Sequence, residues 1–255
     1  MGKMIEIRAT DSSATFSGYL ALPASGKGPG VVIGQEIFGI NANMRAVADF
    51  YAEEGYVALV PDLFWRLQPG IDLGYTEADF ARAIDLFQRL DVDKAVTDID
   101  ASFNALRALP EVEGAGLGYV GFCMGGKLAW LTATRTDVAC AVGYYGMGIE
   151  HLLHESENLK GRLVLHFAEN DGYCDASARA QISQHLTGYD KAEVYVYPGV
   201  DHAFARVGSS HYDKPASLMA HERSIAALKR EIGPHFNLSA LWEDCLLYTS
   251  DAADE

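Results

Sequence analysis

A cysteine lies in the pattern Gly-x-Cys-x-Gly, formed by Gly121, Cys123 and Gly125. An apolar segment precedes the pattern and a helix-forming segment follows from Lys127, which is typical of a nucleophile elbow with cysteine in place of serine. Small residues two positions before and after the nucleophile let the strand and helix backbones pass close to the turn. The helix N-terminus also favours a thiolate. The pattern indicates a nucleophilic cysteine; a buried structural cysteine is the alternative.

A carboxylate and an imidazole that could assist the thiol follow later in the chain. Asp171 comes after the apolar segment 163–168, and His202 comes after the segment 194–197. Taken singly, Asp171 is typical of a turn before glycine and His202 of a solvated loop. Together, the nucleophile, the acid and the histidine occur in the chain order of α/β-hydrolases, in which all three meet at the carboxyl edge of the sheet. We therefore predict a catalytic triad of Cys123, His202 and Asp171.

Backbone N–H groups beside the thiol are expected to form an oxyanion hole. One belongs to Met124, the residue after the nucleophile, and the second to Ile37, in the loop after the first predicted parallel strand. Glu36, in the same loop, places a carboxylate where it can take the proton of Cys123. It can equally form a salt bridge, and Arg206 is the expected partner.

Strand-like and helix-like segments alternate along the chain and predict the scaffold for these residues. Residues 4–10 and 15–22 predict an antiparallel hairpin at a sheet edge. Short apolar segments typical of buried strands, and periodic segments typical of helices, follow in turn. The predicted strands are 31–34, 56–60, 117–121, 139–145, 163–168 and 194–197, and the predicted helices are 44–54, 77–90, 92–109, 127–134, 176–186 and 214–231.

This alternation predicts an α/β fold of the α/β-hydrolase type, with a mostly parallel sheet and helices on both faces. We expect a single domain over residues 1–244, with a long functional loop at 63–74. A nucleotide-binding doubly wound domain is the alternative fold. It is disfavoured because no GxGxxG follows the first parallel strand and the chain has no Walker lysine loop.

Composition excludes several classes of partner. The chain has 255 residues, is 49% hydrophobic and carries a net charge of −15, so neither nucleic acid nor an anionic membrane is expected as a partner. The cysteines have no metal-ligand spacing, and no signal peptide or long apolar run is evident; we expect a cytoplasmic monomer with free thiols, without metal or cofactor. Residues 245–255 lack periodicity and are interpreted as an artefactual or disordered tail.

Taken together, the motifs resemble the dienelactone hydrolase (carboxymethylenebutenolidase) family. The matching residues are Gln35–Asn41, Gly121–Gly126, Asp171 and Asp201–Arg206. The likeness covers about residues 4–231 and includes Pro61–Leu63 and Val142–Gly146. The resemblance implies a cysteine-dependent ester hydrolase that forms a thioester intermediate. The family opens the enol-lactone ring of dienelactone to give maleylacetate, in the breakdown of chloroaromatic compounds.

The resemblance also implies roles for residues around the triad. Glu36 is expected to pair with Arg206 at rest and to take the Cys123 proton when the substrate binds. Arg206 is expected to hold the substrate carboxylate. Phe38 and Tyr145 lie within matching motifs, and we expect both to contact the substrate.

Two positions differ from the family pattern. The family has a second carboxylate-binding arginine early in the helix predicted at 77–90, and here Phe80 takes that place. Arg82, two residues on, points about 200° around a helix. Ala203 stands where a serine is expected. Phe80, Arg82 and Ala203 are nevertheless expected to contact the substrate.

Three alternatives to a dienelactone hydrolase are considered. A broader carboxylesterase or lactonase would use the same mechanism. A dehalogenase would need a carboxylate in place of Cys123. A non-catalytic binding protein on a hydrolase scaffold would not need the intact triad.

Overall fold

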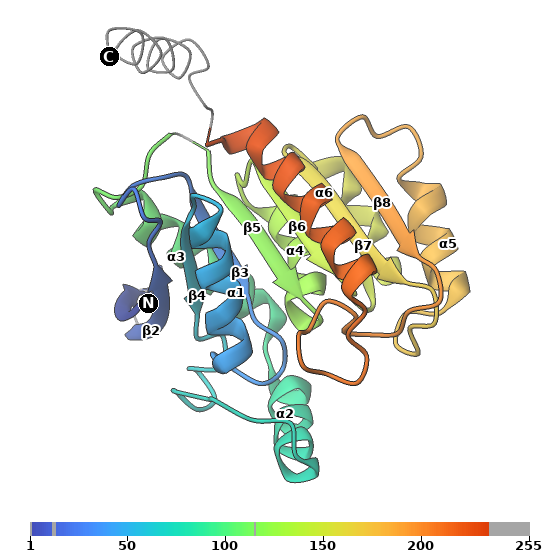
Figure 1. Cartoon of the computed structure of the whole chain (residues 1–255), viewed down its shortest axis with the longest axis horizontal. Helices are drawn as coiled ribbons and strands as arrows, with labels where there is room; N and C mark the ends of the chain where they lie inside the picture. Colours follow the sequence, from blue (N-terminus) through green and yellow to red (C-terminus); the bar gives the residue numbers. More distant parts are fainter. Residues whose placement is uncertain (1, 12–13, 115, 235–255) are drawn as a thin grey trace, which may run out of the picture.

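The computed structural model describes residues 2–11, 14–114 and 116–234. Their strands form one eight-stranded sheet with helices packed around it (Figure 1). The strand order is β1-β2-β4-β3-β5-β6-β7-β8. The strands are β1 (Lys3–Arg8), β2 (Thr15–Ala21), β3 (Gly30–Gly34), β4 (Val57–Pro61), β5 (Gly118–Phe122), β6 (Cys140–Tyr144), β7 (Arg162–Ala168) and β8 (Ala192–Tyr197). The predicted domain end at residue 244 and the predicted tail at 245–255 lie outside the described residues.

The sheet is parallel from β4 to β8 and antiparallel at its N-terminal edge. β3 pairs in parallel with β4 and β5, and β6, β7 and β8 continue the parallel order. β1 and β2 form an antiparallel hairpin, and β2 pairs antiparallel with β4. All residues of β3, β4, β5 and β6 are buried, which explains why these strands are continuous apolar runs rather than alternating ones. The predicted fold class and edge hairpin are confirmed.

Helices cover both faces of the sheet, and one helix stands apart. The α-helices are α1 (Ala42–Glu53), α2 (Glu77–Arg89), α3 (Val92–Arg107), α4 (Met124–Arg135), α5 (Ala176–His185) and α6 (Lys214–Ile232), and η1 (Ile149–His151) and η2 (Leu153–Asn158) are short 3-10 helices. α1 and α6 lie on one face and α3 and α4 on the other, whereas α2 lies beyond the carboxyl ends of the strands (Figure 1). α2 is therefore placed beside the edge at which the predicted site residues emerge.

One predicted helix boundary differs in a way that concerns the site. The helix after β5 begins at Met124, directly after Cys123, rather than at Lys127. Gly125 and Gly126 have low helix propensity, so the sequence alone predicts that the helix begins after them. The two 3-10 helices after β6 are also absent from the prediction, since pieces this short have little periodicity.

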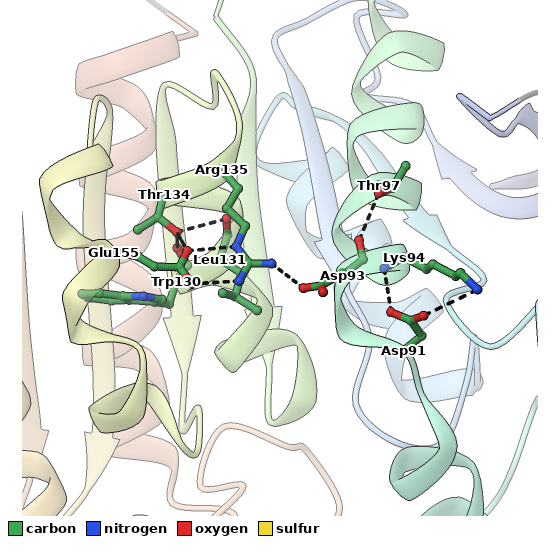
Figure 2. Close-up of polar contacts among 9 residues, drawn as sticks. All are labelled: Asp91, Asp93, Lys94, Thr97, Trp130, Leu131, Thr134, Arg135 and Glu155. Atoms are coloured by element: carbon green, nitrogen blue, oxygen red, sulfur yellow. Dashed lines mark hydrogen bonds and ion pairs between the residues drawn. The ribbon is translucent and has the colours of Figure 1, made fainter.

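An ion-pair network ties α3, α4 and η2 together (Figure 2). Arg135, at the end of α4, donates to both carboxylate oxygens of Glu155 (2.9 and 2.7 Å) and to Asp93 of α3 (2.6 Å). Thr134 also donates to Glu155 (3.0 Å). The hydrogen bond from Arg135 lowers the pKa of Glu155. Because α4 begins directly after Cys123, this network anchors the far end of the helix that follows the predicted nucleophile.

Buried polar side chains connect α6 to the neighbouring strands. His166 of β7 lies 3.0 Å from the Ser224 hydroxyl and 2.9 Å from that of Tyr197. The Tyr144 hydroxyl lies 2.6 Å from that of Ser224 and 3.1 Å from Nδ1 of His221. Burial lowers the pKa of His166 well below its ordinary value and lowers the pKa of His221 to about 4. Both imidazoles are therefore neutral near pH 7.

The free energy of unfolding is expected to fall as the pH is lowered from about 6.5 to about 4. In this window His221 takes up a proton in the unfolded chain, whereas in the folded chain it takes up a proton only near pH 4. The His221 contribution to this loss reaches ~3 kcal/mol. Denaturant titrations on both sides of the window should show a smaller loss for His221→Gln than for the wild type.

The matched control for this prediction is His151, whose side chain is 81% exposed. His151→Gln is expected to lose as much stability as the wild type over the same window. An equal loss in all three proteins would assign the acid sensitivity to groups other than His221.

Candidate active site

Cys123 occupies a strained turn between β5 and α4. Its φ is 55° and its ψ is −111°, a conformation that costs a non-glycine residue about 1–3 kcal/mol. Two backbone hydrogen bonds hold it there: its N–H donates to Tyr144 of β6 (3.0 Å), and its carbonyl accepts from Lys127 (3.2 Å). The N–H of Met124 is the first of α4 and has no helical acceptor. The turn thus presents the sulfur at the positive end of α4.

Glycines allow the backbones around this turn to approach closely. The N–H of Gly125 donates to the carbonyl of Gln35 in the loop after β3 (3.1 Å). A methyl group at Gly125 would overlap the carbonyl oxygen of Gly34, and one at Gly121 would overlap that of Gly125. The Gly-x-Cys-x-Gly spacing is therefore required by the contact of α4 with β3 and β5, as the sequence pattern predicts.

His202 and Asp171 form a hydrogen-bonded pair beside the thiol. Nδ1 of His202 lies 2.9 Å from Oδ2 of Asp171, whose other oxygen accepts the N–H of Tyr173 (2.9 Å). Burial acts to lower the pKa of His202, but its hydrogen bonds to Asp171 and to the Cys123 sulfur, and the negative charges of both, raise that pKa to about 10. The raised pKa of His202 therefore favours a charged imidazolium beside the carboxylate of Asp171 and the sulfur of Cys123.

Two tyrosines fix the plane of the His202 ring. The rings of Tyr145 and Tyr173 contact it edge-on, with centroids at 5.0 and 4.9 Å. Tyr145 is 1% exposed, and its N–H donates to the carbonyl of His166 (2.7 Å). It thus supports the imidazole from within the protein and does not line the cavity, where the sequence-based expectation placed it.

Glu36 and Arg206 form an ion pair, as expected from the sequence. Nη1 of Arg206 donates to Oε2 of Glu36 (3.3 Å), and the Glu36 side chain is 2% exposed. The Arg206 guanidinium also lies over the rings of Tyr75 (4.6 Å) and Phe38 (5.7 Å). Oε1 of Glu36 and Nε of Arg206 have no hydrogen-bond partner among the described residues. Each member of the pair therefore keeps one buried polar atom without a partner among the described residues.

A cavity of about 480 Å³ opens at this edge of the sheet, within the range of small-molecule sites. Its lining brings together these residues of the predicted site: Glu36, Ile37, Phe38, Phe80, Cys123, His202, Ala203 and Arg206. Ala203 has a φ of 64°, and its carbonyl accepts the N–H of Arg206 (2.9 Å), so the turn after His202 directs Arg206 toward Glu36.

Arg82 is the other residue, besides Tyr145, that was expected to contact the substrate and does not line the cavity. Its guanidinium donates to Asp85 (2.9 Å) and to Gln68, on the exposed side of α2. The reason is the rotation of the helix: Phe80 faces the cavity, and Arg82 lies about 200° around from it. The expectation that Arg82 contacts the substrate is therefore not met by this placement.

Several lining residues are missing from the sequence-based prediction. Ile84 and Phe87 of α2, Met147 and Tyr173 face the cavity, and Tyr75 stacks on Arg206. The signal for α2 is its spacing: positions 80, 84 and 87 lie on one helix face. Such an apolar face normally predicts contact with the core, and only the position of α2 beyond the strand ends gives it another role.

The described part of the chain offers no evident metal centre. Within residues 2–11, 14–114 and 116–234, no group of three or more His, Cys, Asp or Glu side chains is arranged to hold a metal ion. None of the helices in these ranges is long and apolar enough to cross a membrane.

The strand order and the position of the site define an α/β-hydrolase fold: the strained turn follows β5, the acid follows β7, and the histidine follows β8. The model of the dienelactone hydrolase family matches residues 16–232. The chain therefore belongs to the dienelactone hydrolase family. The resemblance found in the sequence is confirmed, and with it the assignment to a family of ester hydrolases.

Known relatives agree with this assignment. The chain is 36% identical over 216 residues to a carboxymethylenebutenolidase of a Pseudomonas species, covering 84% of this chain and 90% of the relative. It is 36% identical over 222 residues to a carboxymethylenebutenolidase of Pseudomonas putida, covering 87% and 93%. The crystal structure of dienelactone hydrolase from Anabaena variabilis superposes with a TM-score of 0.66 at 15% identity, covering 91% of this chain and 98% of that one, which supports the fold.

Proposed function

We propose that this protein hydrolyses enol-lactones through a thioester on Cys123, with dienelactone, opened to maleylacetate, as the reference substrate. The observation that carries the proposal is the meeting of three groups in one cavity. These are a cysteine on a strained turn at a helix N-terminus, a His202–Asp171 pair at 2.9 Å, and a buried carboxylate with an unpartnered oxygen at Glu36. The names of the carboxymethylenebutenolidase relatives supply the substrate class.

The first half of the reaction forms the thioester. Glu36 takes the proton of the Cys123 thiol, and the thiolate adds to the lactone carbonyl carbon. The N–H groups of Met124 and Ile37 hold the resulting oxyanion. The ring C–O bond then breaks, and its electron pair stays on the enolate oxygen of the tethered acyl group. An enolate is a good leaving group, so a thiolate is a sufficient nucleophile.

The second half releases the product. In the thioester, the Cys123 sulfur no longer helps to hold a proton on His202, and the imidazolium releases that proton to solvent. The neutral imidazole, oriented by Asp171, then takes a proton from water, and the hydroxide adds to the thioester carbonyl carbon. The C–S bond breaks, and the sulfur regains a proton from the imidazolium. The proton held by Glu36 passes to the enolate, which becomes the ketone of the product. Arg206 gives up part of its interaction with Glu36 to a lactone oxygen or a carboxylate of the substrate, which couples binding to activation of the thiol.

Replacement of Glu36 by glutamine tests this coupling. The amide keeps the shape of the side chain and can accept from Arg206, but it cannot take the thiol proton. We expect kcat/KM for dienelactone to fall by about 10²-fold or more. Glu6→Gln, the same loss of charge on an exposed position of β1, is the control and should retain wild-type turnover. Turnover by Glu36→Gln at the wild-type rate would show that Glu36 does not take the thiol proton and serves only in the ion pair with Arg206.

A broader carboxylesterase or lactonase is the second candidate, favoured by Phe80 at the cavity wall where the family pattern has an arginine. Both candidates use the same triad and differ in the substrate. Initial rates with cis- and trans-dienelactone and with p-nitrophenyl acetate separate them. Cysteine-dependent turnover of the neutral ester, with none of either dienelactone isomer, would select the broader activity.

A further inference from the structure

The α2 side of the cavity is mostly apolar, with Gln88 as its polar member among the described residues, and the mechanism proposed above gives it no role. Phe80, Ile84 and Phe87 follow one another at i, i+4 and i+7 and all line the cavity. The Phe80 ring packs near that of Phe38, with centroids 6.1 Å apart. Met147 lines the same space. These side chains form a continuous apolar wall within the active-site cavity.

Two other contacts of α2 fix its orientation on the protein. Ala83 and Leu86 are fully buried and attach the helix to the body of the protein. A capping box between Thr76 and Asp79 fixes the first turn: the Asp79 N–H donates to the Thr76 hydroxyl (3.2 Å), and the Thr76 N–H donates to the Asp79 carboxylate (3.1 Å). The face that carries Phe80 is thereby held toward the cavity.

The cavity offers little cationic charge to a substrate. Among the described residues that line it, Arg206 is the one side chain with a permanent positive charge, and it is already paired with Glu36. His202 is paired with Asp171, and His211 lies 3.5 Å from Asp201. A substrate with one carboxylate can compete for Arg206. A carboxylate directed at Phe80 would lose part of its hydration without meeting a positive charge; Gln88, the polar side chain that α2 adds to the described lining, offers a neutral amide.

Some aromatic surface at the mouth of the cavity is accessible. Phe80 is 44% exposed and Tyr173 is 57% exposed, although both line the cavity. Covering such surface with an apolar group of a ligand releases water and favours binding. The exposed surface of Phe80 and Tyr173 is therefore surface on which an apolar group of a ligand would gain affinity.

We infer that the wall formed by Phe80, Ile84 and Phe87 is a subsite for an apolar substituent of the substrate. The inference rests on the function proposed above and narrows its substrate class. The preferred substrates are enol-lactones whose exocyclic carbon carries an aryl or alkyl group in place of a carboxylate.

Two lactones that differ at one position test this inference. Dienelactone has a carboxylate on the exocyclic carbon, and γ-benzylidene butenolide has a phenyl group there. Their dissociation constants would be measured by calorimetry on the full-length Cys123→Ala variant, which cannot form the thioester. We expect the phenyl compound to bind about 10- to 100-fold more tightly.

Variants of α2 locate the effect. Phe80→Arg is expected to weaken the phenyl compound and to tighten dienelactone by about tenfold, because a guanidinium replaces apolar surface. Phe80→Leu should keep the wild-type preference. Arg82→Ala, on the exposed side of the same helix, is the matched control and should change neither dissociation constant. Equal or weaker binding of the phenyl compound, or a preference that Phe80→Arg leaves unchanged, would overturn the subsite.

Turnover distinguishes this inference from the proposed function. If the wild type hydrolyses neither lactone in a Cys123-dependent way, the proposed function fails, while the binding data still decide whether the wall accepts the phenyl group. If Cys123-dependent hydrolysis occurs without a phenyl preference in binding, the function stands and the subsite fails.

Discussion

Replacing Cys123 with alanine is expected to lower kcat/KM for enol-lactone hydrolysis by about 10³-fold or more. The variant lacks the atom that forms the thioester, and no other described side chain of the cavity is a cysteine. Alanine keeps the backbone N–H that donates to Tyr144 and removes one sulfur, so the free energy of unfolding should change by about 1 kcal/mol or less. Initial rates on dienelactone, with circular dichroism to establish folding, measure both expectations.

Cys140 is the matched control for this experiment. It lies fully buried in β6, and burial raises its pKa to about 12, which makes its thiol a poor nucleophile. Cys140→Ala is expected to retain turnover and to retain alkylation of Cys123 by iodoacetamide. Full activity of Cys123→Ala, or a wild-type protein in which Cys123 is not alkylated, would remove the thioester mechanism and favour a binding protein on the same scaffold.

Replacing Gly125 with alanine is expected to destabilise the fold by about 3 kcal/mol or more. The added methyl group would overlap the carbonyl oxygen of Gly34 in β3. This obstacle is backbone, so no side-chain rotation relieves it. The N–H of Gly125 would also lose its acceptor at Gln35, and the adjacent Met124 N–H would move away from the oxyanion position. Chemical denaturation and dienelactone turnover should both report the change.

Gly172→Ala is the control for stability. Apart from Gly172 itself and its two chain neighbours, no heavy atom of the described structure lies within 4 Å of the position that its Cβ would take. Its free energy of unfolding should stay within about 0.5 kcal/mol of the wild type. If Gly125→Ala unfolds at the same denaturant concentration as Gly172→Ala, the close contact of α4 with β3 does not determine the geometry of the turn.

The sequence predicts the order of strands and helices well, because buried parallel strands and amphipathic helices have strong local patterns. Its weakest point at the site is the start of α4, where Gly125 and Gly126 conceal the first turn. It also fails for single side chains near the cavity. Tyr145 and Arg82 lie close in sequence to residues that line the cavity, and both point elsewhere.

Chain order alone is sufficient to predict Cys123, Asp171 and His202 as neighbours, because the carboxyl ends of parallel strands meet at one edge. The pairing of Glu36 with Arg206 also follows from the sequence pattern. Tertiary structure alone decides the stacking of Tyr75 on Arg206 and the use of the α2 face. An apolar helix face has the same periodicity whether it covers a core or a cavity. Its role depends on what lies opposite, and residues distant in the sequence determine that.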